Sequence, residues 1–161
     1  MTQPEDTEIL ARVEAAPARR VIGIGALMLL GAMLIYIAFS QPPTFGWQIF
    51  LLVIGGGALW MGERMRRATA TALELTQAEL RDSAGTTLAR VEDMVAVDRG
   101  LFAFKPSNGF LLKVSARAPR AWHPGLWWRI GGRIGVGGLA PQRQTRAMAE
   151  IIASLIARRR A

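Results

Sequence analysis

The residues best suited to binding form a cluster of arginines and tryptophans in the second half of the chain. The cluster consists of Arg117, Arg120, Trp127, Trp128, Arg129 and Arg133. Arginine pairs bidentately with phosphate, and tryptophan favours the headgroup layer of a membrane. These residue types suit contact with anionic lipid headgroups, and an acidic protein partner explains them equally well. A plain solvated surface is the third interpretation, and strand alternation predicts that at least one of the adjacent tryptophans lies in the core.

A second motif, at residues 135–140, has the glycine spacing of a dinucleotide-binding loop. Its sequence is Gly-Val-Gly-Gly-Leu-Ala, and a helical pattern follows it. A dinucleotide site also needs a surrounding βαβ unit and an acidic residue about twenty positions further on. Neither is found in the sequence. We therefore interpret the motif as a strand end and helix entry, and we predict no cofactor.

Catalytic and metal-binding patterns are missing from the sequence. The chain has no cysteine, and its single histidine, His123, lies in a stretch without acidic residues that could orient it. The acids Glu92, Asp93 and Asp98 come closest to a metal cluster, but adjacent strand positions face opposite sides. Solvation in loops, or pairing with Arg90 and Arg99, is the simpler interpretation. The sequence predicts no catalytic residue and no metal site.

The charge of the chain is concentrated after residue 62. The formal net charge is +8. From Glu63 onward there are seventeen Lys and Arg against eight Asp and Glu, and residues 99–149 contain nine basic residues and no acid. Such a basic segment favours anionic lipid or an acidic partner. Nucleic acid is disfavoured because the recognised RNA- and DNA-binding motifs are missing.

Two apolar runs, residues 21–40 and 45–62, precede the basic segment. The first has no charged residue, and at about 1.5 Å per residue it spans about 30 Å, the thickness of a bilayer core. Between the runs, Pro42 and Pro43 break the helical pattern. The sequence therefore predicts a two-helix transmembrane hairpin over residues 21–67. A cleaved signal peptide is disfavoured, because the first run is longer than a typical apolar signal region and a second run follows directly.

The flanks of the two runs predict the orientation of the hairpin. Basic residues occur before the first run and after the second, and the turn between the runs has none. This bias places both chain termini in the cytoplasm, as expected for a multi-pass protein of a bacterial inner membrane. The predicted membrane-interface anchors are Arg19, Arg20, Trp47, Trp60, Arg64, Arg66 and Arg67. The small residues of both runs are expected to pack the two helices together, or to provide a docking face for another membrane protein.

The two segments outside the hairpin are expected to differ in how well they are folded. Residues 1–20 read as a cytoplasmic tail that is either disordered or a short surface helix. Residues 68–161 alternate like β-strands, with a predicted tight hairpin joining residues 101–105 to 110–115 through Asn108-Gly109. An amphipathic helix begins near Pro141 and has an apolar stripe. The fold class is therefore α+β, a small antiparallel sheet or barrel capped by a C-terminal helix.

This order of elements resembles the bacterial pleckstrin-homology-like domains of small membrane proteins. The matched segments are Leu73–Leu75, Leu80–Asp82 with Gly85, the Phe104–Phe110 hairpin and the closing helix. The amino-acid sequences of residues 105–112 and 125–138 also resemble those of small inner-membrane proteins of Gram-negative bacteria. The resemblance implies a pleckstrin-homology-like fold for residues 68–161, and it supplies no catalytic residues.

Together these observations predict a non-enzymatic accessory, assembly or regulatory protein. Its basic domain is expected to contact the inner leaflet or a membrane protein complex. The alternative is a module that senses anionic lipid without a protein partner, and a membrane-bound enzyme is third.

Overall fold

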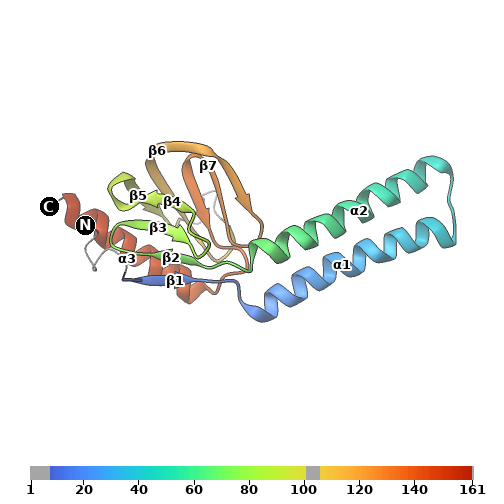
Figure 1. The fold of residues 1–161 in the computed structure, drawn as a ribbon, viewed down its shortest axis with the longest axis horizontal. Coiled ribbons are helices and arrows are strands. Elements are labelled where there is room, and N and C mark those ends of the chain that lie inside the picture. Colours follow the sequence, from blue (N-terminus) through green and yellow to red (C-terminus); the bar gives the residue numbers. More distant parts are fainter. Residues whose placement is uncertain (1–7, 101–105, 161) are drawn as a thin grey trace. The chain divides into compact units, whose positions relative to one another are not determined.

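The computed structural model describes residues 8–100 and 106–160, which form two compact units (Figure 1). One unit is the helical hairpin Pro17–Arg67. The other is a β-domain built from the segments before and after it. The hairpin is therefore inserted within the sequence of the β-domain.

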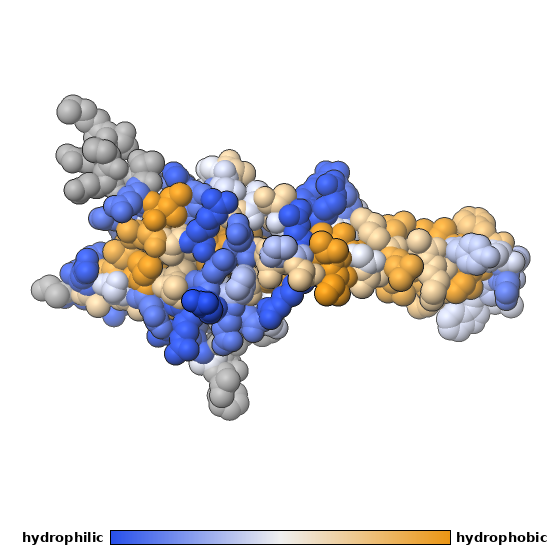
Figure 2. Space-filling view, turned by 90° about the horizontal axis from the view of Figure 1, so that it is seen from below, coloured by the Kyte–Doolittle hydropathy of each residue, from blue (hydrophilic) through white to orange (hydrophobic). Residues whose placement is uncertain are grey.

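The hairpin consists of α1 (Pro17–Ser40) and α2 (Phe45–Ala68), each of 24 residues. At 1.5 Å per residue each helix is about 36 Å long. Both are long and apolar enough to cross a membrane by length and composition, and only 11% of the most apolar window of each is buried. In Figure 2 the exposed surface of the two helices is mostly apolar. The two expected helices are thus present.

Small residues allow the two helices to pack closely. A Cβ atom at Gly31 would lie 2.8 Å from the carbonyl oxygen of Gly55, and one at Gly55 would lie 3.0 Å from the carbonyl oxygen of Gly31. Gly56 and Gly57 have no heavy atom near their Cβ positions. Gly31 and Gly55 therefore form the contact within the hairpin, as the small-residue pattern predicts, and not every glycine takes part in it.

The described residues of the β-domain form two antiparallel sheets and one long helix. The first sheet has the order β1 (Ala11–Val13), β2 (Leu73–Leu75), β3 (Glu79–Asp82) and β4 (Thr87–Arg90). A 3-10 turn, η2 (Val91–Asp93), leads to the second sheet, which has the order β5 (Met94–Asp98), β6 (Phe110–His123) and β7 (Trp127–Val136). The last element is α3 (Gln142–Arg160). This arrangement confirms the α+β prediction.

The core lies between the two sheets and α3. Its fully buried side chains include Leu73, Leu75, Leu80, Met94, Phe110, Leu112, Ile134, Met148 and Ile152. On α3, the buried residues Met148, Ile152 and Ile156 follow one another at intervals of four, so they share one face of the helix. The apolar stripe predicted for this helix is therefore the face that closes the core.

The segment before the hairpin differs from the expected tail or surface helix. Ala11–Val13 form strand β1, in which Ala11 pairs with Leu75 and Val13 pairs with Leu73. Val13 is fully buried. Three residues are too few for a periodic pattern, and their partner strand lies sixty residues away in the sequence. The strand is decided by this distant pairing and not by local preference.

The expected hairpin that joins residues 101–105 to 110–115 is a prediction that the pairing of β6 contradicts, and residues 101–105 themselves lie outside the described residues. β6 starts at Phe110 and pairs on one edge with β5, with Leu111 opposite Asp98, and on the other edge with β7, with Phe110 opposite Val136. Both edges of its first residues are therefore taken by strands other than the expected one. Asn108 adopts a positive φ of 57°. Gly109 allows a close approach of two backbone segments, since a Cβ atom there would lie only 1.8 Å from the carbonyl oxygen of Val136.

Candidate functional site

The predicted arginine–tryptophan cluster lies on the ribbon formed by β6 and β7. The two strands pair antiparallel, with Lys113 opposite Arg133 and Trp122 opposite Trp128. The register shifts twice between these pairs, so the ribbon bends along its length. This ribbon positions every residue of the cluster, and it divides them between its inner and outer faces.

Two residues of the cluster point into the core, which corrects their expected role as lipid or partner contacts. Trp127 is 3% exposed and Arg129 is 9% exposed. The guanidinium of Arg129 donates hydrogen bonds to the carbonyl oxygen of Leu88 at 2.5 Å and to that of Ala116 at 3.4 Å. Trp127 is the core tryptophan that strand alternation predicts.

Irregularities in the two sheets explain why the guanidinium of Arg129 is buried. The pairing of β3 with β4 shifts beside Leu88, and the pairing of β6 with β7 shifts between Lys113 and Ala118. Such shifts leave carbonyl groups outside the regular ladder. Arg129 satisfies one carbonyl from each sheet and so joins them. Nothing in the local sequence around Arg129 indicated this partner in β4.

The outer face of the ribbon carries basic side chains over a shallow groove. Lys113, Arg117 and Arg133 are exposed, and they line the groove with Val95 and Ile130. The groove has a volume of about 660 Å³. We call it the basic groove. Lys113 was not in the predicted cluster, although its acid-free neighbourhood could have indicated it.

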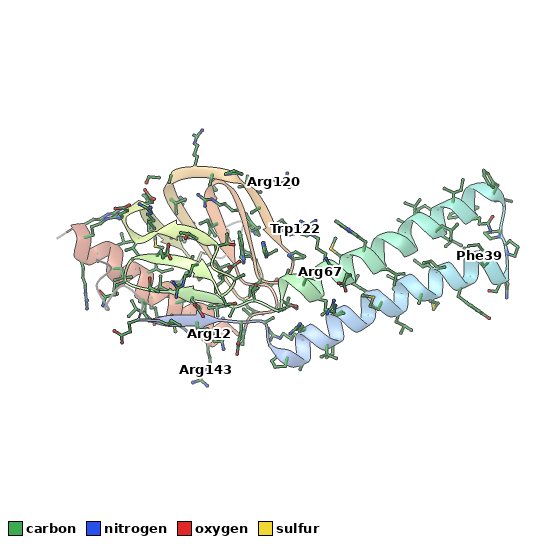
Figure 3. The ribbon with its side chains drawn as sticks, in the orientation of Figure 1. Arg12, Phe39, Arg67, Arg120, Trp122 and Arg143 are labelled. Carbon is green, nitrogen blue, oxygen red and sulfur yellow. The ribbon has the colours of Figure 1, made fainter. Side chains whose placement is uncertain are left out.

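A second hollow lies on the same outer face, toward the turn that joins β6 to β7. It has a volume of about 290 Å³ and is lined by Arg120, Ala121, Trp122, Trp128 and Ile130. We call it the tryptophan cleft. Arg120 and Trp122 extend from the ribbon, whereas Arg12 and Arg143 extend on another side of the domain (Figure 3). Trp122 was not in the predicted cluster either, and it is 41% exposed.

Gly135 leaves room for the indole ring of Trp128. A Cβ atom at Gly135 would lie 2.4 Å from this ring. The ring therefore lies against the backbone of Gly135, where a larger residue would collide with it. The first glycine of the dinucleotide-like motif thus serves the tryptophan cleft.

The remaining part of the glycine-rich motif has its amides already occupied. The N–H groups of Gly137, Gly138 and Leu139 donate to the carbonyl oxygens of Leu126, Ser107 and Gly125 at 2.9, 2.7 and 2.9 Å. A phosphate-binding loop needs such amides directed at the ligand. The motif is therefore a strand end that ties the β6–β7 turn to the start of α3.

The contacts of His123 and of the acidic residues indicate structural roles for these side chains. The His123 ring stacks on Trp127, with 4.4 Å between the ring centroids. Glu92 pairs with Arg90 at 3.3 Å, as expected, whereas Arg99 pairs with Glu150 of α3 at 3.4 Å. Within residues 8–100 and 106–160 no group of three His, Cys, Asp or Glu side chains is placed to hold a metal ion.

The last turn of α3 has a role beyond complementing the helix dipole. Arg159 donates to the carbonyl oxygens of Val91, Glu92 and Met94, and Arg160 donates to that of Val95. These carbonyls belong to η2 and β5, which form the crossing between the two sheets. The C-terminal arginines therefore hold the helix end against this crossing.

The predicted interface anchors gather at two levels of the hairpin. Trp47 and Trp60 are 62% and 56% exposed, and the guanidinium of Arg64 lies 5.3 Å from the Trp60 ring centre. Arg20 donates to the carbonyl oxygen of Arg66 at 3.3 Å, and Glu63 pairs with both Arg66 and Arg67 at 2.7 Å. Arg19 is exposed. Glu63 thus offsets part of the positive charge after the second run.

Comparisons with protein-family models, with curated proteins and with solved structures gave no match for this chain.

Proposed function

We propose that this chain is a two-span protein of the bacterial inner membrane, with the segments on both sides of the hairpin in the cytoplasm. Its β-domain is a non-enzymatic binding module of pleckstrin-homology-like type. The protein acts as an accessory, assembly or regulatory factor, and its basic groove contacts an acidic partner at the membrane.

The membrane placement is supported by the hairpin. Its two helices have the length and composition of membrane spans, and their middle parts carry no charged side chain. Basic residues lie at the end of the hairpin that joins the β-domain, and the turn at residues 41–44 has none. This distribution favours a cytoplasmic β-domain.

The pleckstrin-homology-like assignment is supported by the order of the elements. In the part of the chain that the structure describes, four antiparallel strands are followed by three antiparallel strands and one closing helix. The hairpin enters between the first and second strands.

The exposed positive charge of the basic groove is the observation that carries the proposed function. Lys113, Arg117 and Arg133 lie together, and the ion pairs among the described residues involve other arginines. A basic surface with no acidic counterpart of its own raises the local concentration of anionic partners. The apolar side chains of Val95 and Ile130 in the same groove add contact area that a purely solvated surface would not need.

The test is a pulldown of the tagged full-length protein from its native membranes in mild detergent, with mass spectrometry of the retained proteins. The groove variant replaces Lys113, Arg117 and Arg133 by glutamine. The control variant replaces Arg90, Arg143 and Arg158 by glutamine, which changes the net charge equally on exposed positions elsewhere.

We expect the wild type and the control to retain a stoichiometric membrane complex that the groove variant loses. Equal retention by all three proteins would contradict a role for the groove. Recovery of the protein with acidic lipid and no protein partner would favour the alternative, a lipid-sensing module. Extraction of the protein by alkaline carbonate, which releases peripheral proteins, would contradict the membrane placement itself.

A further inference from the structure

We propose that the tryptophan cleft binds the phosphate-bearing headgroup of one anionic phospholipid. This inference rests on the proposed function, because it requires a membrane next to the β-domain. It assigns a ligand to a second surface, which adjoins the basic groove at Ile130 but has its own basic residue, Arg120.

The first argument is the position of the cleft within the β-domain. Ala16, the residue before α1, donates its N–H to the carbonyl oxygen of Leu139 at 3.0 Å, and Leu139 donates to the carbonyl oxygen of Gly125 at 2.9 Å. A Cβ atom at Gly125 would lie 3.2 Å from the methyl group of Thr69, one residue after α2 ends. The β6–β7 turn therefore lies where the chain leaves for the hairpin and where it returns.

The cleft is close to this turn along both strands. Trp122 and Trp128 are each three residues from Gly125, which is about 10 Å along a strand. Both covalent connections to the proposed membrane hairpin leave the domain beside this turn, so the proposal places the cleft close to the bilayer surface. Tryptophan favours the headgroup layer of a membrane, which suits the two indole rings of the cleft.

The second argument is the chemistry of the cleft walls. Arg120 is exposed, and the ion pairs of the described residues do not include it. Its guanidinium can bind a phosphate group through two parallel hydrogen bonds. The indoles and Ile130, which is 48% exposed, provide an apolar wall for the glycerol and upper acyl region of the same lipid.

The size of the cleft favours a single headgroup over a protein segment. Its volume of about 290 Å³ is at the lower end of the range of small-molecule sites. An acidic protein finds a larger and more basic surface in the basic groove. Charge complementarity, the two tryptophans and the position at the connections together favour anionic lipid as the occupant.

The test counts lipid molecules on the intact protein. The full-length protein in mild detergent is titrated with phosphatidylglycerol or with phosphatidylcholine of the same acyl chains, and the bound lipid is counted by native mass spectrometry. The cleft variants are Arg120→Gln and Trp122→Ala. The controls are Arg143→Gln, which removes an exposed arginine of α3, and the groove variant defined above.

We expect wild type and Arg143→Gln to bind one phosphatidylglycerol in preference to phosphatidylcholine. Arg120→Gln should weaken this binding about fivefold, the effect of one basic residue at an anionic surface. Trp122→Ala should weaken the binding of both lipids, because it removes the apolar wall. Arg120 is exposed, so its variant is expected to keep the fold.

Four results would overturn the inference. The cleft variants could bind phosphatidylglycerol like the wild type, Arg143→Gln could lose as much binding as Arg120→Gln, or inorganic phosphate could displace the lipid at equal concentration. Loss of lipid in the groove variant alone would place the lipid site in the groove and would also overturn it. The membrane pulldown is a separate measurement, so its failure and the failure of this inference are distinguishable.

Discussion

One buried and one exposed arginine donate hydrogen bonds to backbone carbonyls that the sheets of this domain leave open. Arg129 connects β4 to β6 from inside the core, and Arg159 connects α3 to η2. Arginine suits this role because its planar fork of donors reaches two carbonyls at once and keeps its charge. The basic composition of the domain therefore has two uses. Some arginines hold the fold together, and others are exposed on the surface, where we propose that they bind.

A residue-scale prediction concerns Arg129. Arg129→Met keeps most of the side-chain volume and removes the hydrogen bonds to Leu88 and Ala116. We expect a loss of about 2–3 kcal/mol in the free energy of unfolding, chiefly because the buried carbonyl of Leu88 loses a charged donor. The measurement is denaturant unfolding of the full-length protein in detergent, followed by tryptophan fluorescence.

The matched control is Arg133→Met on the exposed side of the same strand. It should change the free energy of unfolding by less than about 0.5 kcal/mol. Equal stabilities of the two variants would show that the contacts of Arg129 do not contribute to the fold.

At the scale of elements, the helical hairpin depends on where its glycines lie and not on how many there are. Gly31 and Gly55 bring the two helix backbones together, whereas Gly56 and Gly57 face open space. Gln48 supports the pair by donating to the carbonyl oxygen of Ala38 at 2.9 Å. In lipid, such close packing and interhelical hydrogen bonds stabilise helix pairs, because no hydrophobic effect drives apolar helices together.

An element-scale prediction compares two alanine substitutions in this hairpin. Gly31→Ala places a methyl group 2.8 Å from the carbonyl oxygen of Gly55, a backbone atom that moves only if the helices separate. We expect a destabilisation of about 1–3 kcal/mol, typical of overpacking. The measurement is unfolding in sodium dodecyl sulfate, followed by far-ultraviolet circular dichroism.

Gly56→Ala is the control for this substitution, because its methyl group meets no heavy atom within 4 Å. It should leave the hairpin as stable as the wild type or slightly more stable, since alanine favours the helix. A Gly31→Ala protein as stable as Gly56→Ala would contradict the close helix contact.

At the scale of the whole molecule, the β-domain is completed by the segment that precedes the hairpin. Strand β1 closes one edge of the first sheet, and α3 packs against it. Glu14 also donates its N–H to the side chain of Gln144 in α3 at 3.0 Å. A fragment that starts at residue 68 therefore lacks part of its own fold.

A whole-molecule prediction follows from this insertion. A chain in which residues 17–67 are replaced by a flexible linker of about ten Gly and Ser residues should fold as a cooperative unit. The fragment 68–161 should be less stable by at least about 2 kcal/mol, because the fully buried Val13 and the pairing of β1 are lost. The measurement is thermal unfolding of both proteins under the same conditions.

The reverse order of stabilities would contradict the role of β1. A linker variant that fails to fold would show that the β-domain depends on the hairpin itself.

The sequence alone determined the elements whose signals are local. Apolar length predicted both helices of the hairpin, Pro42 and Pro43 predicted the break between them, and spacing predicted the apolar stripe of α3. These features depend on residues close together in the chain, so composition and periodicity are sufficient to find them. The α+β class followed from the order of such elements.

Tertiary structure alone decided which cluster residues are available for binding. Trp127 and Arg129 are buried in the core of the domain, whereas Arg117 and Arg133 are exposed on its surface. Strand pairing places Trp122 opposite Trp128. Two register shifts in the β6–β7 ribbon break the simple alternation, and the carbonyl partner of Arg129 lies 41 residues away. Strand β1 likewise depends on a partner across the hairpin. Pairings between distant segments leave no periodic trace in the sequence, and therefore only the folded chain reveals them.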